Sequence, residues 1–368
     1  MSVLKEFSEL TFFDLFSGVG GFRVAAEEYF RKLGFPVRCV GFCEKDRFAM
    51  KTYRSNFNTQ NDAYFSEVEK VTLFNHEKIL EIGQSADPKR MKQIRDRLPR
   101  FEVLFAGFPC QSFSTLGNKL GFDDLRGNLF FHILAILNAV QPPFLVLENV
   151  RGLRTIKNGS VLKLILGELQ KDYVVFHWLV NSANYGVPQI RRRIFIVGIR
   201  RNVHFWKDLT LAPKEVALKT SKYPTAWHLL ERKVDEKYYL SDKLKKTILS
   251  NGTGGYSYIS RINQLIARPL CYTMHKMHRA SQDNYYSDDF IHGTFDEKTW
   301  TVKFAQNGHG HDRIRRITPL EAFRLQGFPE TFVTHAKGAG VSDTRLYMQA
   351  GNAVTVPVVK EVLRYVFN

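Results

Sequence analysis

Short apolar runs alternate with segments of helical periodicity through the first half of the chain. The runs predict strands and the periodic segments predict helices. The expected strands are residues 10–16, 37–43, 101–105, 144–147, 173–180 and 194–199, and the expected helices are residues 22–33, 129–140 and 161–169. Strands that alternate with helices form βαβ units, so we expect an α/β domain with a doubly wound, mostly parallel sheet covered on both faces. Ligands bind such sheets where loops leave the carboxyl ends of the strands.

The pattern changes beyond about residue 205, where the alternation stops and charged and aromatic residues mix. Residues 205–315 are therefore expected to form a smaller, irregular second domain. A helical pattern resumes at Ile317, and residues 355–366 predict a last helix. The expected division is a first domain of residues 1–204 completed by 340–368, the second domain, and a hinge segment of residues 316–339.

The composition is that of a folded globular protein with an excess of positive charge. Of 368 residues, 44% are hydrophobic and 24% charged, which excludes a disordered, collagen-like or disulfide-stapled miniature protein. Lys and Arg total 53 against 36 Asp and Glu, so the formal net charge is +17. This charge favours a polyanionic partner, with nucleic acid first, although a basic protein without a specific partner has the same composition.

Targeting and metal-binding patterns are not found in the sequence. The first residues lack a secretory signal, and no stretch approaches the roughly 18 apolar residues of a membrane span, so we expect a cytoplasmic protein with no membrane partner. Four cysteines in a chain this long do not make a disulfide framework. Cys39 and Cys43 lack the paired ligands of a zinc site, and no metal is expected. Residues 87–100, dense in Lys and Arg, predict an exposed helix, with a nucleic-acid contact as the alternative.

A glycine-rich turn follows the first predicted strand and opens a helix, in the sequence DLFSGVGGF from Asp14. Glycine at such a turn lets a nucleotide-type cofactor approach the backbone and the start of the helix. Arg23 stands where a dinucleotide motif needs glycine, which disfavours a nicotinamide cofactor. Glu44 closes the second strand, where a carboxylate can bind ribose hydroxyls. A tight structural turn and a surface glutamate would give the same pattern.

Further candidate catalytic and binding side chains lie at the ends of later strands. Cys110, in GFPCQSFS, comes directly after the third strand, where a thiol can be activated as a nucleophile, although most cysteines are buried apolar residues. Glu148, at the end of the fourth strand, lies beside Cys110 if the two strands are neighbours. Arg191 and Arg193 alternate with apolar residues and are expected to project to one side, as phosphate or base contacts or as a solvated strand end.

Six motifs in this order, DLFSGVGGF, GFPCQSFS, ENV, QIRRR, RITPLEAFRLQGFP and QAGNAVTVPV, together resemble the DNA cytosine-5 methyltransferase family. The resemblance extends over residues 12–360, nearly the whole chain, and the gap before the fifth motif is where that family keeps its target-recognition domain. The resemblance implies a Rossmann-like fold that binds S-adenosyl-methionine. It also implies a compact enzyme of the prokaryotic restriction-modification type.

The resemblance assigns the chemistry to a few residues. Cys110 would add to carbon 6 of a cytosine swung out of the duplex, because carbon 5 is otherwise too poor a nucleophile to accept a methyl group. Glu148 would hold ring nitrogen 3 and the exocyclic amine, and Arg193 would contact the base carbonyl oxygen, with Arg191 nearby and Gln189 supporting the loop. The base that removes the carbon-5 proton is not identified.

The resemblance likewise implies a set of cofactor contacts. Phe16 would stack on the adenine, the glycine turn would lie beside the methionine moiety, Glu44 would bind the ribose, and Asp62 would read the adenine amine. Asp62 precedes Ala63 rather than the usual isoleucine, and Lys45 replaces a tryptophan of some members. The complete implied set is Phe16, Gly18, Val19, Gly20, Gly21, Glu44, Asp62, Pro109, Leu129, Asn352 and Ala353.

Double-stranded DNA is the implied substrate, acted on by a monomer, with a cognate restriction endonuclease as a possible genetic partner. Residues 205–315 would read base edges in the major groove. Two alternatives stay open. A tRNA-methylating branch of the family carries a Cys-Phe-Thr triplet similar to Cys271-Tyr-Thr, and a binding protein that had lost activity would keep the fold but would not need Cys110, Glu148 and Arg193.

Overall fold

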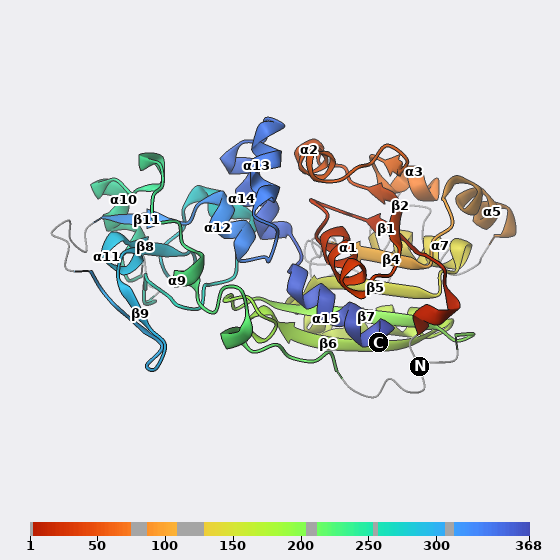
Figure 1. The fold of residues 1–368 in the computed structure, drawn as a ribbon. Coiled ribbons are helices and arrows are strands. Elements are labelled where there is room, and N and C mark those ends of the chain that lie inside the picture. The colour runs from red at the N-terminus through yellow and green to blue at the C-terminus, as the bar shows by residue number, and fades with distance from the viewer. Residues whose placement is uncertain (1–2, 75–86, 109–128, 204–211, 253–256, 306–312) are drawn as a thin grey trace. The chain divides into compact units, whose positions relative to one another are not determined.

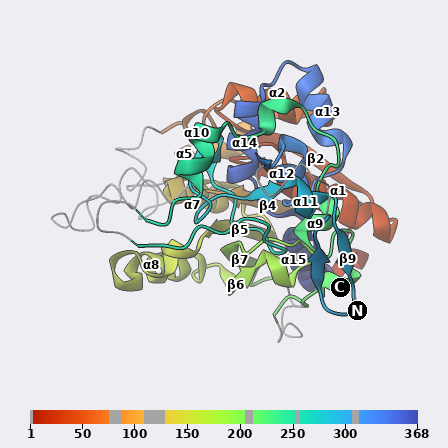
Figure 2. The same ribbon diagram turned by 90° about the vertical axis from the view of Figure 1, so that its left-hand side faces the viewer.

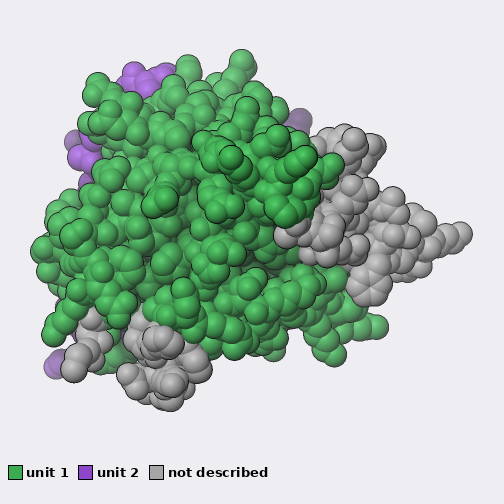
Figure 3. Space-filling model, turned by 90° about the vertical axis from the view of Figure 1, so that its right-hand side faces the viewer, with its two compact units in different colours: residues 1–180, 192–214, 359–368 green, residues 181–191, 215–358 purple. Residues whose placement is uncertain are grey.

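The computed structural model of the chain describes residues 3–74, 87–108, 129–203, 212–252, 257–305 and 313–368. The chain divides into two compact units, shown in different colours in Figure 3. Unit 1 comprises residues 1–180, 192–214 and 359–368, and unit 2 comprises residues 181–191 and 215–358. Of the segment 340–368 that was expected to complete the first domain, only residues 359–368 group with unit 1, and the expected hinge 316–339 lies within unit 2.

Unit 1 contains a seven-stranded sheet in the order β3-β2-β1-β4-β5-β7-β6 (Figure 1). The pairs from β3 to β5 are parallel, and β7 runs antiparallel to β5. The predicted α/β class with a mostly parallel sheet is therefore confirmed. The strands are β1 (Leu10–Leu15), β2 (Val37–Cys43), β3 (Ala63–Phe65), β4 (Val103–Gly107), β5 (Phe144–Val150), β6 (Tyr173–Asn181) and β7 (Arg192–Arg200).

Two layers of helices enclose this sheet, because successive strand residues point to opposite faces. Phe13 of β1 belongs to a core formed with α3, α5, α7 and α8, whereas Phe12 packs edge-on against Phe105, which stacks on Phe22 of α1. The end of α15 reaches the same face, where Phe367 contacts Phe144. Figure 2 shows α7 and α8 on one side of the strands and α1 and α15 on the other. The helices are α1 (Gly21–Leu33), α2 (Arg47–Asn56), α3 (Val68–Thr72), α5 (Pro88–Arg97), α7 (Leu129–Val140), α8 (Ser160–Leu169) and α15 (Val356–Phe367).

The basic segment 87–100 forms the exposed helix that its composition predicts. Asp87 caps α5 by accepting the backbone N–H of Lys89, and Pro88 occupies the first turn. Met91 and Ile94 are the residues that α5 buries. They lie three positions apart and so share one face, which leaves the Lys and Arg side chains on the other.

Unit 2 is assembled from short elements, as the irregular sequence pattern predicts. Its two-stranded sheets pair β8 (Tyr285–Ser287) with β11 (Ile314–Arg316) and β9 (Thr294–Asp296) with β10 (Thr301–Lys303). The Arg315 guanidinium and the Glu321 carboxylate form a buried ion pair at 2.7 Å, and Glu321 also closes a capping box with Thr318. The helices are α9 (Ala226–Leu229), α10 (Asp242–Ile248), α11 (Asp288–Ile291), α12 (Pro319–Arg324), α13 (Thr331–Gly338) and α14 (Asp343–Asn352).

Within the described residues, no helix is long and apolar enough to cross a membrane.

Candidate active site

The turn between β1 and α1 is held in a conformation that few residues adopt. The backbone φ angle is +57° at Phe16, +55° at Gly18 and +88° at Gly20. A Cβ atom at Gly20 would lie 2.4 Å from the ring of Phe57, so glycine is required there by both backbone and space. Phe16 has no such freedom, and a non-glycine residue in the left-handed region costs about 1 kcal/mol or more. Strain of this kind is typical of ligand-binding turns.

Glu44 ties the end of β2 to this turn. Its Oε2 accepts the backbone N–H of Gly18 at 2.8 Å, and its Oε1 accepts the N–H of Asp46 at 2.7 Å. Burial raises the pKa of Glu44, and these two N–H donors oppose the shift. The carboxylate is therefore held in place from two sides and can bind hydroxyl donors only through its remaining lone pairs. Neighbouring Lys45 is exposed.

Two buried polar side chains beside the turn make no hydrogen bond of acceptable geometry within the part of the chain that the structure describes. They are the carboxylate of Asp14, which is fully buried, and the hydroxyl of Ser17. Burial raises the pKa of Asp14 well above its ordinary value. Unsatisfied buried acceptors are costly and are found where a ligand supplies the missing donor. The sequence analysis did not single out either residue, although both lie within the first motif.

Asp62 makes an ion pair with Arg23, the residue that departs from the dinucleotide pattern. Arg23 Nη1 lies 2.6 Å from Asp62 Oδ2, and Arg23 Nε lies 2.7 Å from Glu27 Oε1. The guanidinium also stacks 4.7 Å from the ring centroid of Phe57. One carboxylate oxygen of Asp62 is therefore engaged by Arg23. Asp62 directly precedes β3, the edge strand that pairs with β2 from Gly41 to Cys43.

The carboxyl ends of β4 and β5 lie side by side, as the sequence analysis required if Cys110 and Glu148 are to share a crevice. In the parallel register, Gly107 is paired with Glu148. Asn149 Nδ2 donates to the carbonyl of Phe108 at 2.9 Å, which anchors the last described residue of this segment. Pro109 and Cys110 themselves lie outside the described residues. Asn149 is a positioning group that the sequence analysis did not identify.

Glu148 and Arg193 face each other across β5 and β7. Arg193 Nε lies 3.0 Å from Glu148 Oε1, and the two side chains are 20% and 13% exposed. β7 begins at Arg192 and runs antiparallel to β5, which brings Arg193 opposite Val150. The pair is thus mostly shielded from solvent, and it presents an acceptor next to a cation.

Arg191 has a different set of partners, so the expectation that it projects with Arg193 is wrong. It precedes β7, is 1% exposed, and donates to three backbone carbonyls. The contacts are 2.8 Å to Leu270, 3.0 Å to Gly351 and 2.9 Å to Ala353. Arg191 therefore fixes the backbone of unit 2.

Gln189 acts in the same way within unit 2. Its side-chain amide donates to the carbonyl of Leu325 at 2.8 Å and accepts the N–H of Leu270 at 3.0 Å. Both polar ends of a fully buried amide are thus satisfied by backbone.

The other predicted cofactor residues are distributed over both units. Leu129 begins α7 and packs against the core of unit 1. Asn352 ends α14 as an exposed residue of unit 2, and Ala353, which follows it, is buried and supplies a carbonyl to Arg191. Phe16, Gly18, Val19, Gly20, Gly21, Glu44, Asp62, Leu129, Glu148 and Arg193 belong to unit 1, whereas Gln189, Arg191, Asn352 and Ala353 belong to unit 2.

Comparison with known families decides what kind of protein carries this site. The family model described as C-5 cytosine-specific DNA methylase matches residues 10–368. The chain belongs to this family. It is therefore a DNA methylase acting on carbon 5 of cytosine, and the expected family and reaction are confirmed.

Two bacterial relatives are similar to this methylase along most of their length. It is 34% identical to the Type II methyltransferase M.DsaV of Dactylococcopsis salina, over 97% of this chain and 86% of that protein. It is also 34% identical to the Type II methyltransferase M.HpaII of Haemophilus parainfluenzae, over 96% of this chain and 87% of that protein.

Solved structures share the fold of this methylase at lower identity. The methyltransferase EhMeth of Entamoeba histolytica superposes with a TM-score of 0.67 and 19% identity, over 98% of each chain. A DNMT2 mutant of Spodoptera frugiperda superposes with a TM-score of 0.66 and 19% identity, over 98% of this chain and all of that one. This likeness supports the fold alone.

Proposed function

We propose that Cys110 is the nucleophile of this methylase and that Glu148 and Arg193 hold the target cytosine. The observation that carries the proposal is the Glu148–Arg193 ion pair at the carboxyl end of β5, next to the end of β4. Cys110 follows Gly107 by three residues, and Gly107 is paired with Glu148. An acceptor, a cation and a thiol at adjoining strand ends suit covalent catalysis on a planar base.

The proposed steps begin with the thiolate of Cys110. Its sulfur adds to carbon 6 of cytosine, the C5–C6 double bond opens, and the electron pair moves towards nitrogen 3, where Glu148 supplies a proton or hydrogen bond. Arg193 would stabilise the base carbonyl oxygen while the ring carries this extra electron density. Carbon 5 has then become an enamine carbon and can accept a methyl group. Loss of the carbon-5 proton to a base re-forms the double bond and expels the thiolate.

S-adenosyl-methionine is the cofactor proposed for this site, and when bound it supplies the methyl group. The residues beside the β1–α1 turn fit such a cationic, amine-bearing molecule, because Asp14 and Ser17 offer acceptors without partners in the described structure. Glu44, Asp62, Phe16 and the turn from Gly18 to Gly21 would hold the remainder. Leu129, Pro109, Asn352 and Ala353 would complete the set.

Arg191 and Gln189 are proposed as positioning residues rather than groups that touch the base. Arg191 holds the carbonyls of Gly351 and Ala353, on either side of Asn352, at 3.0 and 2.9 Å. The conformation of this turn therefore depends on a guanidinium that is sealed from solvent.

Duplex DNA is the proposed substrate, and the target cytosine must leave the base stack at a cost of a few kcal/mol. The net charge of +17 favours phosphate contacts, so binding is expected to weaken steeply with salt. Residues 205–315 are proposed to read the DNA sequence. Because the similar relatives are Type II methyltransferases, we propose that the enzyme belongs to a restriction-modification system with a partner endonuclease. We also propose that it acts in a bacterial cytoplasm and as a monomer.

The test uses bisulfite sequencing of DNA from cells that express the wild-type chain, Cys110→Ser or Glu148→Gln. We expect methylated cytosines at one short sequence for the wild type and none for Cys110→Ser. Undiminished methylation by Cys110→Ser would overturn the nucleophile. A duplex carrying 5-fluorocytosine at the identified site should trap the wild-type enzyme covalently, because the fluorine blocks loss of the carbon-5 substituent. Methyl transfer to tRNA but not to duplex DNA would favour the alternative substrate.

A further inference from the structure

Three side chains of metal-binding type come together in unit 2, and none of them belongs to the set proposed for methyl transfer. Cys271 precedes a short 3-10 helix (Tyr272–Lys276), and His278 and Asp283 lie in the loop that follows. Their ligand atoms all lie within 4.8 Å of one another. His278 Nδ1 is 3.3 Å from Asp283 Oδ2. The sequence analysis missed this group because the spacing resembles none of the common paired zinc motifs.

The distance from His278 Nδ1 to Asp283 Oδ2 is that of two ligands around one small cation. Zinc bonds to nitrogen and oxygen of about 2.0–2.2 Å, at tetrahedral angles, put two such ligand atoms roughly 3.3 Å apart. A thiolate, an imidazole and a carboxylate are also the donor types that zinc accepts together. Three protein ligands leave a fourth position for water.

The imidazole of His278 supplies an independent sign of a missing partner. Its Nδ1 atom is sealed from solvent and, within the described part of the chain, makes no hydrogen bond of acceptable geometry. The nearby Asp283 Oδ2 instead accepts the backbone N–H of His278 at 2.8 Å. A buried ring nitrogen without a well-directed hydrogen bond costs free energy, and a metal ion would satisfy it.

The backbone around the three ligands is already fixed. Gly351 of α14 lies so close to Cys271 that an added Cβ would meet the Cys271 carbonyl carbon at 2.3 Å. Arg191 holds the adjacent Leu270 carbonyl at 2.8 Å. At the other end of the segment, the Asp283 N–H donates to the Arg279 carbonyl at 3.0 Å. The site is thus preorganised and does not depend on folding of the loop around the metal.

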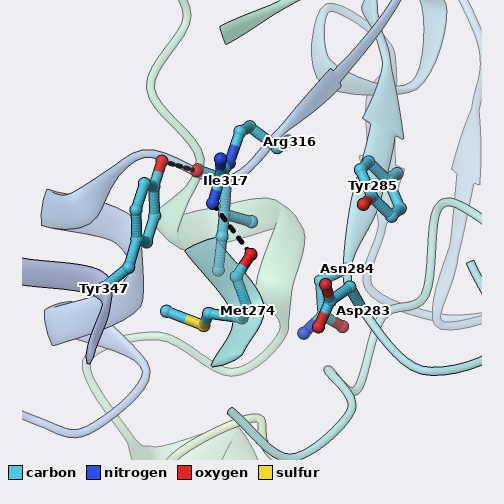
Figure 4. Close-up of a pocket in the computed structure, with 7 residues that line it drawn as sticks. All are labelled: Met274, Asp283, Asn284, Tyr285, Arg316, Ile317 and Tyr347. Carbon is cyan, nitrogen blue, oxygen red and sulfur yellow. Dashed lines mark hydrogen bonds between the residues drawn. The ribbon is translucent and has the colours of Figure 1, made fainter. Parts of the chain in front are cut away.

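Asp283 also borders a small pocket shared with Met274, Tyr285 and Arg316 (Figure 4). The Arg316 guanidinium is the cation of this pocket, and it donates to the carbonyl of Met274 at 3.1 Å, as the dashed line in Figure 4 shows. Asp283 is 8% exposed, and its charge is met mainly by one backbone N–H and the neighbouring imidazole. A divalent cation would supply the missing positive charge.

We propose that Cys271, His278 and Asp283 bind one Zn²⁺ ion. The ion would bridge the start of the 3-10 helix to the following loop and so hold residues 271–283 in one conformation. This segment carries His275, Lys276 and Arg279, which lie in the region proposed to contact DNA. The zinc proposal does not rest on the methyl-transfer proposal.

The test measures metal on the full-length protein. Purified wild-type chain is loaded with Zn²⁺, dialysed to equilibrium against buffer, and analysed for zinc by mass spectrometry. A parallel sample is titrated with Co²⁺, because a cobalt-bound thiolate gives a sulfur-to-metal charge-transfer band. We expect one tightly held metal ion per chain and that band. Cys271→Ser should abolish the band and weaken zinc binding by more than about 100-fold, since loss of even an outer partner of a ligand costs 10–100-fold.

Matched variants test whether zinc binding depends on these three side chains in particular. His278→Gln and Asp283→Asn should also lose zinc, whereas His275→Gln, on the same segment, should retain it. Cys110→Ser should retain zinc while losing methyl transfer, so the two proposals can fail separately. Circular dichroism checks that each variant is folded. The proposal is overturned if the folded wild type retains no stoichiometric zinc, or if folded Cys271→Ser and His278→Gln bind zinc and Co²⁺ as the wild type does.

Discussion

Arg193 Nε lies 3.0 Å from Glu148 Oε1, and both side chains are largely shielded. This contact fixes the Glu148 carboxylate relative to the strand end that leads to Cys110. It places a cation beside an acceptor, the two kinds of group that the proposed function uses to contact the carbonyl oxygen and the ring nitrogen of cytosine.

Replacing Arg193 by Lys should therefore slow methyl transfer even though the charge is kept. A lysine ammonium lacks the planar donor geometry of the guanidinium, and loss of one aligned donor to a developing negative charge costs about 10²–10³-fold in rate. Single-turnover methylation of a saturating duplex measures this. Arg192→Lys, at an exposed neighbouring position, is the control and should keep the wild-type rate. Equal rates for the two variants would contradict the role given to Arg193.

Arg191→Met should destabilise the protein rather than act on the chemical step. Removing the guanidinium leaves the carbonyls of Leu270, Gly351 and Ala353 buried without their donor, which costs about 2–5 kcal/mol. Urea unfolding measures the loss, with Arg192→Met as the matched control. If Arg191→Met unfolded at the wild-type urea concentration, the three contacts would not be stabilising.

Gly20→Ala should be far more damaging than alanine at a helical glycine. The Cβ would lie 2.4 Å from the Phe57 ring at a φ of +88°, so strain and overpacking together cost about 2–4 kcal/mol. Gly167→Ala, in the exposed part of α8 where nothing lies within 4 Å, should instead stabilise by up to about 1 kcal/mol. Thermal unfolding of the two variants should shift in opposite directions.

Asp14→Asn should raise the stability of the protein at high pH and weaken its binding of S-adenosyl-methionine. Burial raises the pKa of Asp14, so its ionisation opposes folding, and the stability of the unliganded wild type should fall as pH rises above the unfolded value near 4. The asparagine variant lacks this pH dependence and should be more stable than the wild type at pH 8.

The affinity of Asp14→Asn for S-adenosyl-methionine should fall by about 10–100-fold with the loss of a charged acceptor. Calorimetric titration and urea unfolding at pH 5 and 8 test both parts, and unchanged affinity would remove Asp14 from the cofactor site.

Glu330 should contribute to stability only above acidic pH. Burial alone would raise its pKa, but hydrogen bonds from Arg324, Tyr223 and Lys222 outweigh burial and lower the pKa to about 2. A depressed pKa means that the stabilisation is complete above the unfolded value near 4.3 and is lost as pH falls towards 2. Wild type should therefore be more stable than Glu330→Gln at pH 7, with the difference shrinking below about pH 4. A pH-independent difference would point to packing instead.

The sheet could be predicted because most of its strands are buried on both faces and read as continuous apolar runs. β2 and α7 begin and end at the predicted residues, and β5 extends the predicted run by only three residues, through Glu148 to Val150. β3 was missed since three half-exposed residues at a sheet edge need no apolar run. The segment from Ile317 was expected to be helical, but α12 is only six residues long.

The site was predictable where it depends on strand ends and not where it depends on tertiary contacts. β4 and β5 are consecutive strands of the chain and are also neighbours in the sheet. This arrangement supports the pairing of Cys110 with Glu148. The partners of Arg191 come from residues 79 to 162 positions away, and no local pattern encodes them. The group of Cys271, His278 and Asp283 likewise depends on the path of a loop.

The segment 181–191, from the last residue of β6 to the residue before β7, groups with unit 2 although both strands lie mainly in unit 1. A chimera that exchanges the recognition region of this methylase for that of a relative must therefore transplant two separate pieces of chain. A graft of residues 215–358 alone would leave Arg191 and Gln189 of the recipient facing backbone groups of the donor. Successful exchange of DNA specificity should require that 181–191 travel with the donor.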